Sequence, residues 1–343
     1  QVLLAVMAGM YAVYHGPKGL EFIANQIHFK ANALRDGLKV LGFDTVEEPI
    51  FDTVKIRMQE EEKNILMRMM RDYKINLNYF TEGVVSISVN EATTKEKLQT
   101  LFDAFANVKD KQSFKLIFKE EVEIPKEFLR TDEILTDEVF NKYHTETELM
   151  RYIKRLERKD LSLTHSMISL GSCTMKLNAA TEMLPLSWPE WGSVHPFVPI
   201  EQAGGYQSLI QELERDLAEI TGFAGTSLQP NSGAQGEYAG LMVIREYHKS
   251  RGESHRNIVL IPQSAHGTNP ASAVIAGMKV VVVKNLENGE IDFEDLKAKA
   301  EQHSENLSAA MITYPSTYGF FDDNIIEITK LIHEHGGQVY MDG

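Results

Sequence analysis

The second half of the chain alternates between continuous apolar runs and amphipathic stretches of helical length. The apolar runs are residues 257–261, 278–284, 309–314 and 339–341. The helix-like stretches between them are residues 270–277, 292–303 and 324–335. Uninterrupted apolar runs are typical of strands buried on both faces. Strands alternating with helices form a parallel sheet, so we predict an α/β domain over residues 166–343.

The preceding part of the chain has a different rhythm. Val85, Ile87 and Val89 alternate with serines, as in a half-buried strand, and residues 94–108 carry a helical apolar stripe. Mixed helices and mostly antiparallel strands predict a small α+β domain over residues 18–125.

Two further segments complete the predicted domain organisation. Residues 126–165 are charged and weakly periodic, apart from a helix opened by a Thr145/Glu148 capping box, and are interpreted as a connector. Residues 1–17 are interpreted as the end of a buried helix, broken near Gly16 and Pro17. Because there is no initiating Met and the last strand stops at Gly343, we expect an internal segment of a longer protein.

Composition limits the classes of function. A chain of 343 residues favours two domains. The net charge of −14, without a Lys/Arg run, argues against binding of nucleic acid. Cys173 is the single cysteine, which fits a reducing compartment, and we expect a cytoplasmic protein, or a mitochondrial matrix protein in a eukaryote. The apolar first 14 residues are shorter than the roughly 20 that a membrane span requires.

Small, polar and ionisable residues follow the predicted strands. The segment after the strand at 257–261 contains His266 and Thr268, the one after 309–314 contains Thr317, and Asp342 ends the last strand. Ligands of open parallel sheets bind at the carboxyl ends of the strands, so these side chains should gather at one rim.

A Gly-rich turn at residues 231–236 precedes a predicted helix. Free backbone N–H groups and the helix dipole at Ser232, Gly233 and Ala234 would suit an anion such as a phosphate. The turn lacks the Gly-Lys-Ser/Thr of a P-loop and the spacing of a dinucleotide fingerprint. Helix capping by Asn231 or Ser232 is an equally simple interpretation.

Pyridoxal 5'-phosphate (PLP) would account for this set of residues jointly. Its phosphate fits a helix N-terminus, its ring could stack on His266, and its pyridine nitrogen needs a carboxylate such as Asp342 to stay protonated. Each residue alone has a simpler explanation, as a core histidine or a helix cap, but their order along the chain favours the site.

The motifs at these positions resemble those of one enzyme family, the glycine decarboxylases, or P-proteins of the glycine cleavage system. The resemblance rests on Leu-Gly-Ser-Cys-Thr-Met-Lys-Leu-Asn at 170–178, Pro-Asn-Ser-Gly-Ala-Gln-Gly-Glu at 230–237, Ser-Ala-His-Gly-Thr-Asn-Pro at 264–270, Thr-Tyr-Pro-Ser-Thr-Tyr-Gly at 313–319, Met-Asp-Gly at 341–343 and Leu-Arg-Thr-Asp at 129–132. It extends over essentially the whole chain.

The resemblance implies the fold of the aspartate-aminotransferase class of PLP-dependent transferases, in two tandem halves. Residues 1–17 would end the large domain of the first half and residues 18–125 would be its small domain. Residues 166–343 would be the incomplete PLP-binding large domain of the second half. The family's Schiff-base lysine lies beyond Met-Asp-Gly, so this segment lacks it, and Lys279 and Lys284 are outside its motif.

The resemblance also implies an activity, a cofactor and partners. Glycine would be decarboxylated with PLP, and its aminomethyl group would pass to the lipoyl arm of the H-protein, an oxidoreductase reaction. Other glycine cleavage system proteins would be partners, and the full chain would be a homodimer. Ser232, Gly233 and Ala234 would hold the phosphate, His266 and Asp342 the ring, and Thr268 and Thr317 would donate hydrogen bonds nearby. Weaker candidates that could face the substrate are Lys176, His195 and Gln202.

Other classes of function remain open at this point. One alternative is another PLP enzyme, such as a serine hydroxymethyltransferase or a cysteine desulfurase, and another is a non-catalytic scaffold that docks the H-protein. A hydrolase built on Ser172 or Cys173 is disfavoured, because the lysine spacing is wrong and there is no nucleophile elbow. His333 and His335 diverge on a helix, so a metal site there is also disfavoured.

Overall fold

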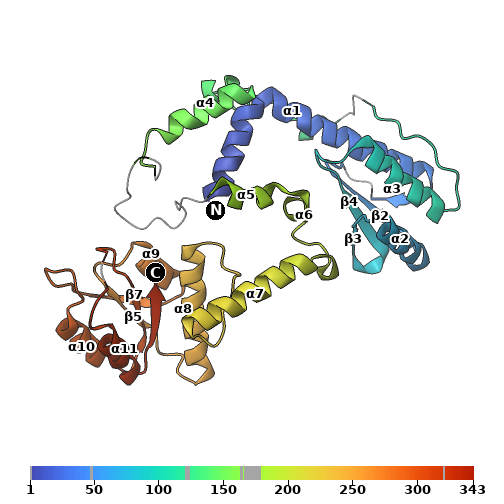
Figure 1. Cartoon of the computed structure of the whole chain (residues 1–343). Coiled ribbons are helices and arrows are strands. Elements are labelled where there is room, and N and C mark those ends of the chain that lie inside the picture. The colour runs from blue at the N-terminus through green and yellow to red at the C-terminus, as the bar shows by residue number, and fades with distance from the viewer. Residues whose placement is uncertain (1, 47–48, 120–123, 163–164, 166–178, 320) are drawn as a thin grey trace. The chain divides into compact units, whose positions relative to one another are not determined.

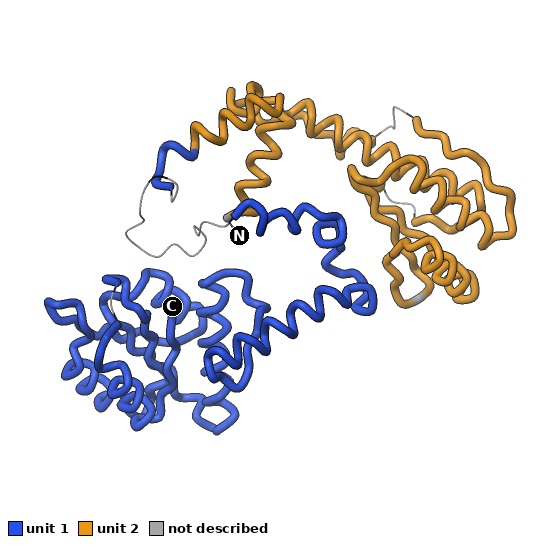
Figure 2. Tube along the Cα trace, in the orientation of Figure 1, with its two compact units in different colours: residues 1, 157–343 blue, residues 2–156 orange. Residues whose placement is uncertain are grey.

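The computed structural model describes the chain except residues 1, 47–48, 120–123, 163–164, 166–178 and 320. The chain divides into two compact units, residues 2–156 and residues 157–343 (Figure 2). Each unit has its own hydrophobic core.

Residues 2–156 form one unit of helices and antiparallel strands (Figure 1), which is longer at both ends than the α+β domain predicted over residues 18–125. The helices described there are α1 (Val2–Val40), α2 (Glu60–Asp72), α3 (Lys95–Val108) and α4 (Glu146–Glu157). The strands are β1 (Asp44–Thr45), β2 (Thr53–Arg57), β3 (Asn78–Tyr79) and β4 (Val84–Ser88). They pair antiparallel in the order β1-β2-β4-β3.

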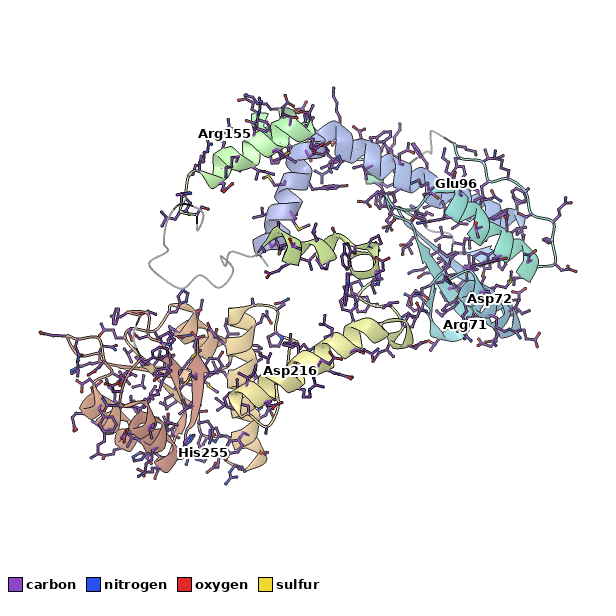
Figure 3. The ribbon with its side chains drawn as sticks, viewed as in Figure 1. Arg71, Asp72, Glu96, Arg155, Asp216 and His255 are labelled. Atoms are coloured by element: carbon purple, nitrogen blue, oxygen red, sulfur yellow. The ribbon has the colours of Figure 1, made fainter. Side chains whose placement is uncertain are left out.

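Alternating residues of β2 and β4 supply the core of this unit. Val54, Ile56, Val85 and Ile87 are buried and pack with apolar side chains of α1, α2 and α3. Polar residues on the outer faces of the helices, such as Arg71 and Glu96, are exposed (Figure 3).

The break expected near Pro17 is present as a kink at Gly16. Gly16 has φ 62° and ψ −178°, a left-handed φ that favours glycine. A Cβ there would meet the Phe140 carbonyl oxygen at 2.6 Å and the His144 ring at 2.7 Å. His144 Nδ1 also lies 2.7 Å from the Tyr14 carbonyl oxygen. The predicted connector therefore packs directly against the kink.

The second unit contains the expected parallel sheet. Its strands are β5 (Ile258–Pro262), β6 (Lys279–Val283), β7 (Leu307–Thr313) and β8 (Gln338–Asp342). All described pairings are parallel, in the order β6-β5-β7-β8. The helices are α5 (Ala180–Met183), α6 (Pro189–Gly192), α7 (Gly204–Thr221), α8 (Gly233–Ser250), α9 (Thr268–Ile275), α10 (Phe293–Gln302) and α11 (Ile325–Glu334).

Successive residues of β5 point to opposite faces of this sheet, as the pleat requires. Ile258 and Leu260 belong to the core that α10 and α11 cover. Val259 and Ile261 belong to the core that α8 and α9 cover. Both faces of β5 are therefore buried, which explains the uninterrupted apolar run and confirms the α/β fold class.

The secondary structure expected from periodicity is confirmed, with boundaries that differ by a few residues. The two-residue strands β1 and β3 and the short helices α5 and α6 were not expected, because such short elements carry no periodic signal. None of the helices in the described part of the chain has the length and apolar character of a membrane span.

Candidate functional site

The order in which strands are added to the sheet reverses between β5 and β7, because β6 follows β5 on one side and β8 follows β7 on the other. The helix after β5 is α9, which lies on one face, whereas the helix after β7 is α11, which lies on the other. Adjacent strands whose connections leave to opposite faces open a crevice at their carboxyl ends, where ligands of such sheets bind. Thr317 bridges the two loops by donating its hydroxyl proton to the Ser264 carbonyl oxygen at 2.6 Å.

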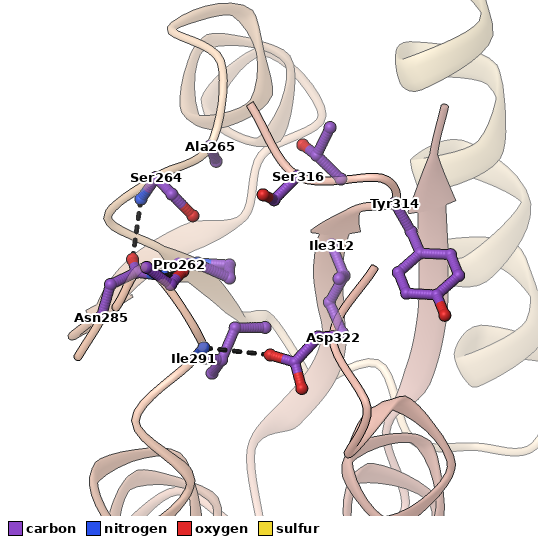
Figure 4. Close-up of a pocket in the computed structure, with 11 residues that line it drawn as sticks. Pro262, Ser264, Ala265, Asn285, Ile291, Ile312, Tyr314, Ser316 and Asp322 are labelled. Atoms are coloured by element: carbon purple, nitrogen blue, oxygen red, sulfur yellow. Dashed lines mark hydrogen bonds between the residues drawn. The ribbon is translucent and has the colours of Figure 1, made fainter. Parts of the chain in front are cut away.

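A small pocket lies at this crevice (Figure 4). Asn285 closes one side by accepting the Ser264 N–H at 2.9 Å. Asp322, only 5% exposed, accepts the N–H groups of Ile291 and Asn324 at 3.0 Å each. Since both carboxylate oxygens already accept backbone donors, we interpret this pocket as a structural joint of the loops.

Asp342 lies at the carboxyl end of β8 and is held by an amide. The Asn269 Nδ2 donates to Asp342 Oδ2 at 3.1 Å. Asn269 Oδ1 accepts from the Thr313 hydroxyl at 3.3 Å, which fixes the amide orientation. Asn269 is fully buried at the start of α9, whereas Asp342 is partly exposed. The hydrogen bond to Asn269 therefore fixes the orientation of the Asp342 carboxylate through its Oδ2 atom.

His266 lies between β5 and α9 and belongs to a second polar group. Its Nδ1 lies 2.8 Å from the Thr268 hydroxyl, which donates to Glu237 Oε1 at 2.7 Å. Glu237 Oε2 accepts from the Ser272 hydroxyl at 2.7 Å. Glu237 comes from α8 and is only 4% exposed, whereas the His266 ring is exposed.

The N-terminus of α8 lies one turn before Glu237. Ser232 caps the helix by accepting the Gln235 N–H at 3.3 Å, which confirms capping by Ser232. Gly233 and Ala234 are exposed. A Cβ added to Gly233 would meet nothing within 4 Å, and its φ is not in the left-handed range. Neither packing nor backbone conformation therefore requires glycine there.

Tyr340 of β8 is close enough to both polar groups to be influenced by their charges. Burial, followed by the charges of Asp342 and Glu237, raises the pKa of Tyr340 to about 12. Its ring lies where a Cβ of Gly240 would be, 2.4 Å from the Cε2 atom. The absence of a side chain at Gly240 thus lets β8 approach α8.

These contacts bring several of the sequence candidates together. Glu237 links α8 to Thr268, and the next residue, Asn269, links α9 to Asp342. His266, Thr268, Asp342 and the start of α8 therefore share one connected rim. The sequence reasoning did not single out Glu237, Asn269, Ser272 or Tyr340. The only signal was a polar residue at an apolar-facing helix position, which does not identify its partner.

The weaker candidates are placed elsewhere or not described. Lys176, with Ser172 and Cys173, lies outside the described residues. His195 is exposed and its Nδ1 accepts the Phe197 N–H at 3.0 Å within its own loop. Gln202 ends the short 3-10 helix Ile200–Gln202.

The histidines near the end of α11 have structural contacts. His333 Nδ1 lies 3.0 Å from the Gly337 carbonyl oxygen, and His335 Nδ1 lies 3.0 Å from the Ser304 hydroxyl. Among the residues that the structure describes, His, Cys, Asp and Glu side chains form no group of three that could hold a metal ion.

The chain is similar in sequence to one protein family and to individual bacterial proteins. The family model described as "Glycine cleavage system P-protein" matches residues 1–105. Glycine dehydrogenase (decarboxylating) from Christiangramia forsetii is 61% identical over 344 residues, and the protein of that name from Flavobacterium johnsoniae is 56% identical. Each similarity covers 100% of this chain and 36% of the relative, so the chain spans about a third of the relatives' length.

A solved structure is similar at a much lower level. The crystal structure of mouse CSAD matches 50% of this chain and 38% of its own, at 18% identity and a TM-score of 0.41. A similarity of this size carries no argument about function.

Proposed function

We propose that this chain is a segment of a protein of the glycine cleavage system P-protein family, and that the complete protein decarboxylates glycine with PLP. The aminomethyl group that remains would pass to the lipoyl disulfide of the H-protein, which is reduced. The same proposal includes the other glycine cleavage system proteins as partners. It also includes a homodimeric full-length chain that is located in the cytoplasm, or in the mitochondrial matrix of a eukaryote.

The observation that carries the proposal is the Asp342 carboxylate at the carboxyl end of β8. Buried Asn269 binds one of its oxygens at 3.1 Å, and the carboxylate itself remains partly exposed. A carboxylate in this position suits a pyridine nitrogen, whose proton it would hold by charge and hydrogen bonding.

The remaining residues of the rim fit the same cofactor. Gly233 and Ala234 are exposed at the start of α8, and a Cβ added at Gly233 would lie in open space. A phosphate there would gain from the helix dipole of α8. His266 has an exposed ring that could stack on the cofactor. Thr268 and Thr317 already donate their hydroxyl protons to Glu237 and Ser264, so we assign them to positioning the loops and His266.

The bound cofactor would supply a protonated ring that accepts the electron pair left on glycine when CO2 departs. Asp342 would keep the proton on the ring nitrogen, and Asn269 would keep Asp342 oriented. The α8 N-terminus would anchor the phosphate and thereby fix the ring against His266. Lys176, His195 and Gln202 stay candidates for contacts with the glycine carboxylate or the lipoyl arm.

The test uses the full-length protein and an Asp342→Asn variant. We expect the wild type to bind PLP and to release CO2 from carboxyl-labelled glycine in the presence of lipoylated H-protein. Asp342→Asn should still bind PLP, but its kcat should fall roughly 100-fold, as when one electrostatic group is lost from an active site. Asp323→Asn is the matched control, because Asp323 is exposed in the loop before α11.

Two results would contradict the proposal. Absence of PLP binding by the full-length protein would remove the assigned cofactor. An unchanged kcat in Asp342→Asn would remove the role assigned to the carboxylate while leaving the cofactor assignment standing.

A further inference from the structure

Glu237, Thr268 and His266 form a chain of hydrogen-bonding atoms, and the proposed function assigns no role to Glu237. Glu237 Oε1 lies 2.7 Å from the Thr268 hydroxyl oxygen, which lies 2.8 Å from His266 Nδ1. The other oxygen of Glu237 accepts the Ser272 hydroxyl at 2.7 Å. Glu237 and Ser272 are 4% and 5% exposed, so the carboxylate end of this chain is shielded from water.

Counting protons fixes the direction of these bonds. A threonine hydroxyl has one proton to donate, and an ionised carboxylate only accepts. A buried carboxylate is strongly destabilised without donors, so the Thr268 proton is committed to Glu237. The Thr268 oxygen can then only accept from His266, which requires the proton on Nδ1.

A competing contact favours the opposite arrangement. The Thr268 backbone N–H points at His266 Nδ1 over 3.2 Å, which suits an unprotonated nitrogen. This contact is longer than the other two, and hydrogen bonds to an ionised group are roughly twice as strong as neutral ones. The carboxylate therefore decides the outcome, and its removal should let the backbone N–H decide instead.

We infer that Glu237 is a positioning residue that acts through Thr268 to hold His266 in its Nδ1–H tautomer. The lone pair is then on Nε2, and the ring is fixed by a bond to α9 and, through Thr268, to α8. The meaning of this for catalysis rests on the proposed function, in which the His266 ring contacts the cofactor. The tautomer itself is a property of the protein without cofactor.

The test is neutron diffraction from crystals of the deuterated full-length protein, prepared without PLP. The wild type should show deuterium on His266 Nδ1 and none on Nε2. In Glu237→Leu the freed Thr268 hydroxyl can donate to Nδ1, and in Thr268→Val only the backbone N–H remains. Both variants should therefore carry the deuterium on Nε2.

The matched control is Glu246→Leu, the same change on the exposed side of α8, where Glu246 pairs with Lys249. It should keep the wild-type tautomer. If Glu237→Leu does not fold, Thr268→Val carries the test alone. An unprotonated Nδ1 in the wild type, or an Nδ1–H tautomer that survives in Thr268→Val, would overturn the inference. Since no cofactor is present, a failure of PLP binding in the earlier experiment would leave this result unaffected.

Discussion

Gly233 is informative at the scale of a single residue because the protein itself does not need glycine there. Its φ is outside the left-handed range, and an added Cβ would have no neighbour within 4 Å. Gly204, the first residue of α7, is equally open. The two positions thus have the same local setting, and only Gly233 lies at the proposed phosphate site.

We predict that Gly233→Ala weakens PLP binding about tenfold, equivalent to about 1.4 kcal/mol, because its methyl group narrows the approach to the N–H groups. Neither Gly233→Ala nor Gly204→Ala should destabilise the fold, since alanine has a higher helix propensity than glycine. PLP titrations and urea unfolding of both variants measure the two effects. Equal PLP affinity in the two variants would contradict a phosphate at α8.

Tyr340 links stability to pH, also at the residue scale. Its pKa is raised from 10 to about 12 in the folded protein, mainly by burial and then by Asp342 and Glu237. The folded state therefore binds the phenolic proton more tightly than the unfolded state does. The resulting stability is fully present below pH 10 and is lost as the pH rises to about 12.

We predict that Tyr340→Phe removes this part of the alkaline loss of stability. The ring is only half-buried, so the effect should be about 1 kcal/mol after allowance for solvent screening. Urea unfolding of wild type and variant across this pH range measures it. Tyr79, whose pKa burial alone raises to about 12, provides a comparison variant, Tyr79→Phe. A wild-type pH dependence in Tyr340→Phe would refute the prediction.

At the scale of elements, the contact between α8 and β8 depends on one missing side chain. The Tyr340 ring occupies the position of a Gly240 Cβ, at 2.4 Å. One turn earlier, a Cβ at Gly236 would meet only the Tyr340 hydroxyl, at 4.0 Å. The same substitution on the same helix should therefore have opposite effects.

Gly240→Ala should lower the free energy of unfolding by about 1–3 kcal/mol, because the ring and β8 must move. Gly236→Ala should be neutral or stabilising by up to about 1 kcal/mol, because of its better helix propensity. Denaturant unfolding measures both free energies. Equal effects of the two substitutions would mean that the close approach is not maintained in solution.

At the scale of the whole molecule, the cores of the two units are built from separate parts of the chain. One core lies within residues 31–116, and the others lie within residues 241–332. A Cβ at Gly37 would meet Leu116 and Phe102 at 2.6 and 2.8 Å, inside the first core.

An overpacked core should therefore lower the local stability of its own unit and leave that of the other unit unchanged. We predict that Gly37→Ala accelerates amide hydrogen exchange in β2 and β4 but not in β5 and β7, and that Gly240→Ala does the reverse. Hydrogen exchange followed by mass spectrometry on the full-length protein resolves these strands. Faster exchange in both sheets from either substitution would show that the units unfold together.

The sequence by itself determined the longer strands and helices and several residues of the rim. The continuous runs at β5 and β7 are those of strands buried on both faces, and the helices between them show a period of 3.6. Since parallel strands end at the same edge, the sequence alone assigns His266, Thr268 and Asp342 to one rim. This inference needs only local periodicity and the direction of the strands.

Only the tertiary structure decided which of these residues are connected. The bond between Asn269 and Asp342 joins positions 73 residues apart, and the bond between Glu237 and Thr268 joins positions 31 apart. The sheet order places β7 between β5 and β8, so the carboxyl ends of these three strands lie at one edge. Periodicity records whether a side chain faces the core, but not which strand or helix lies opposite. The partners of Asp342 and His266 therefore emerged only from the packing of α8 and α9 on the sheet.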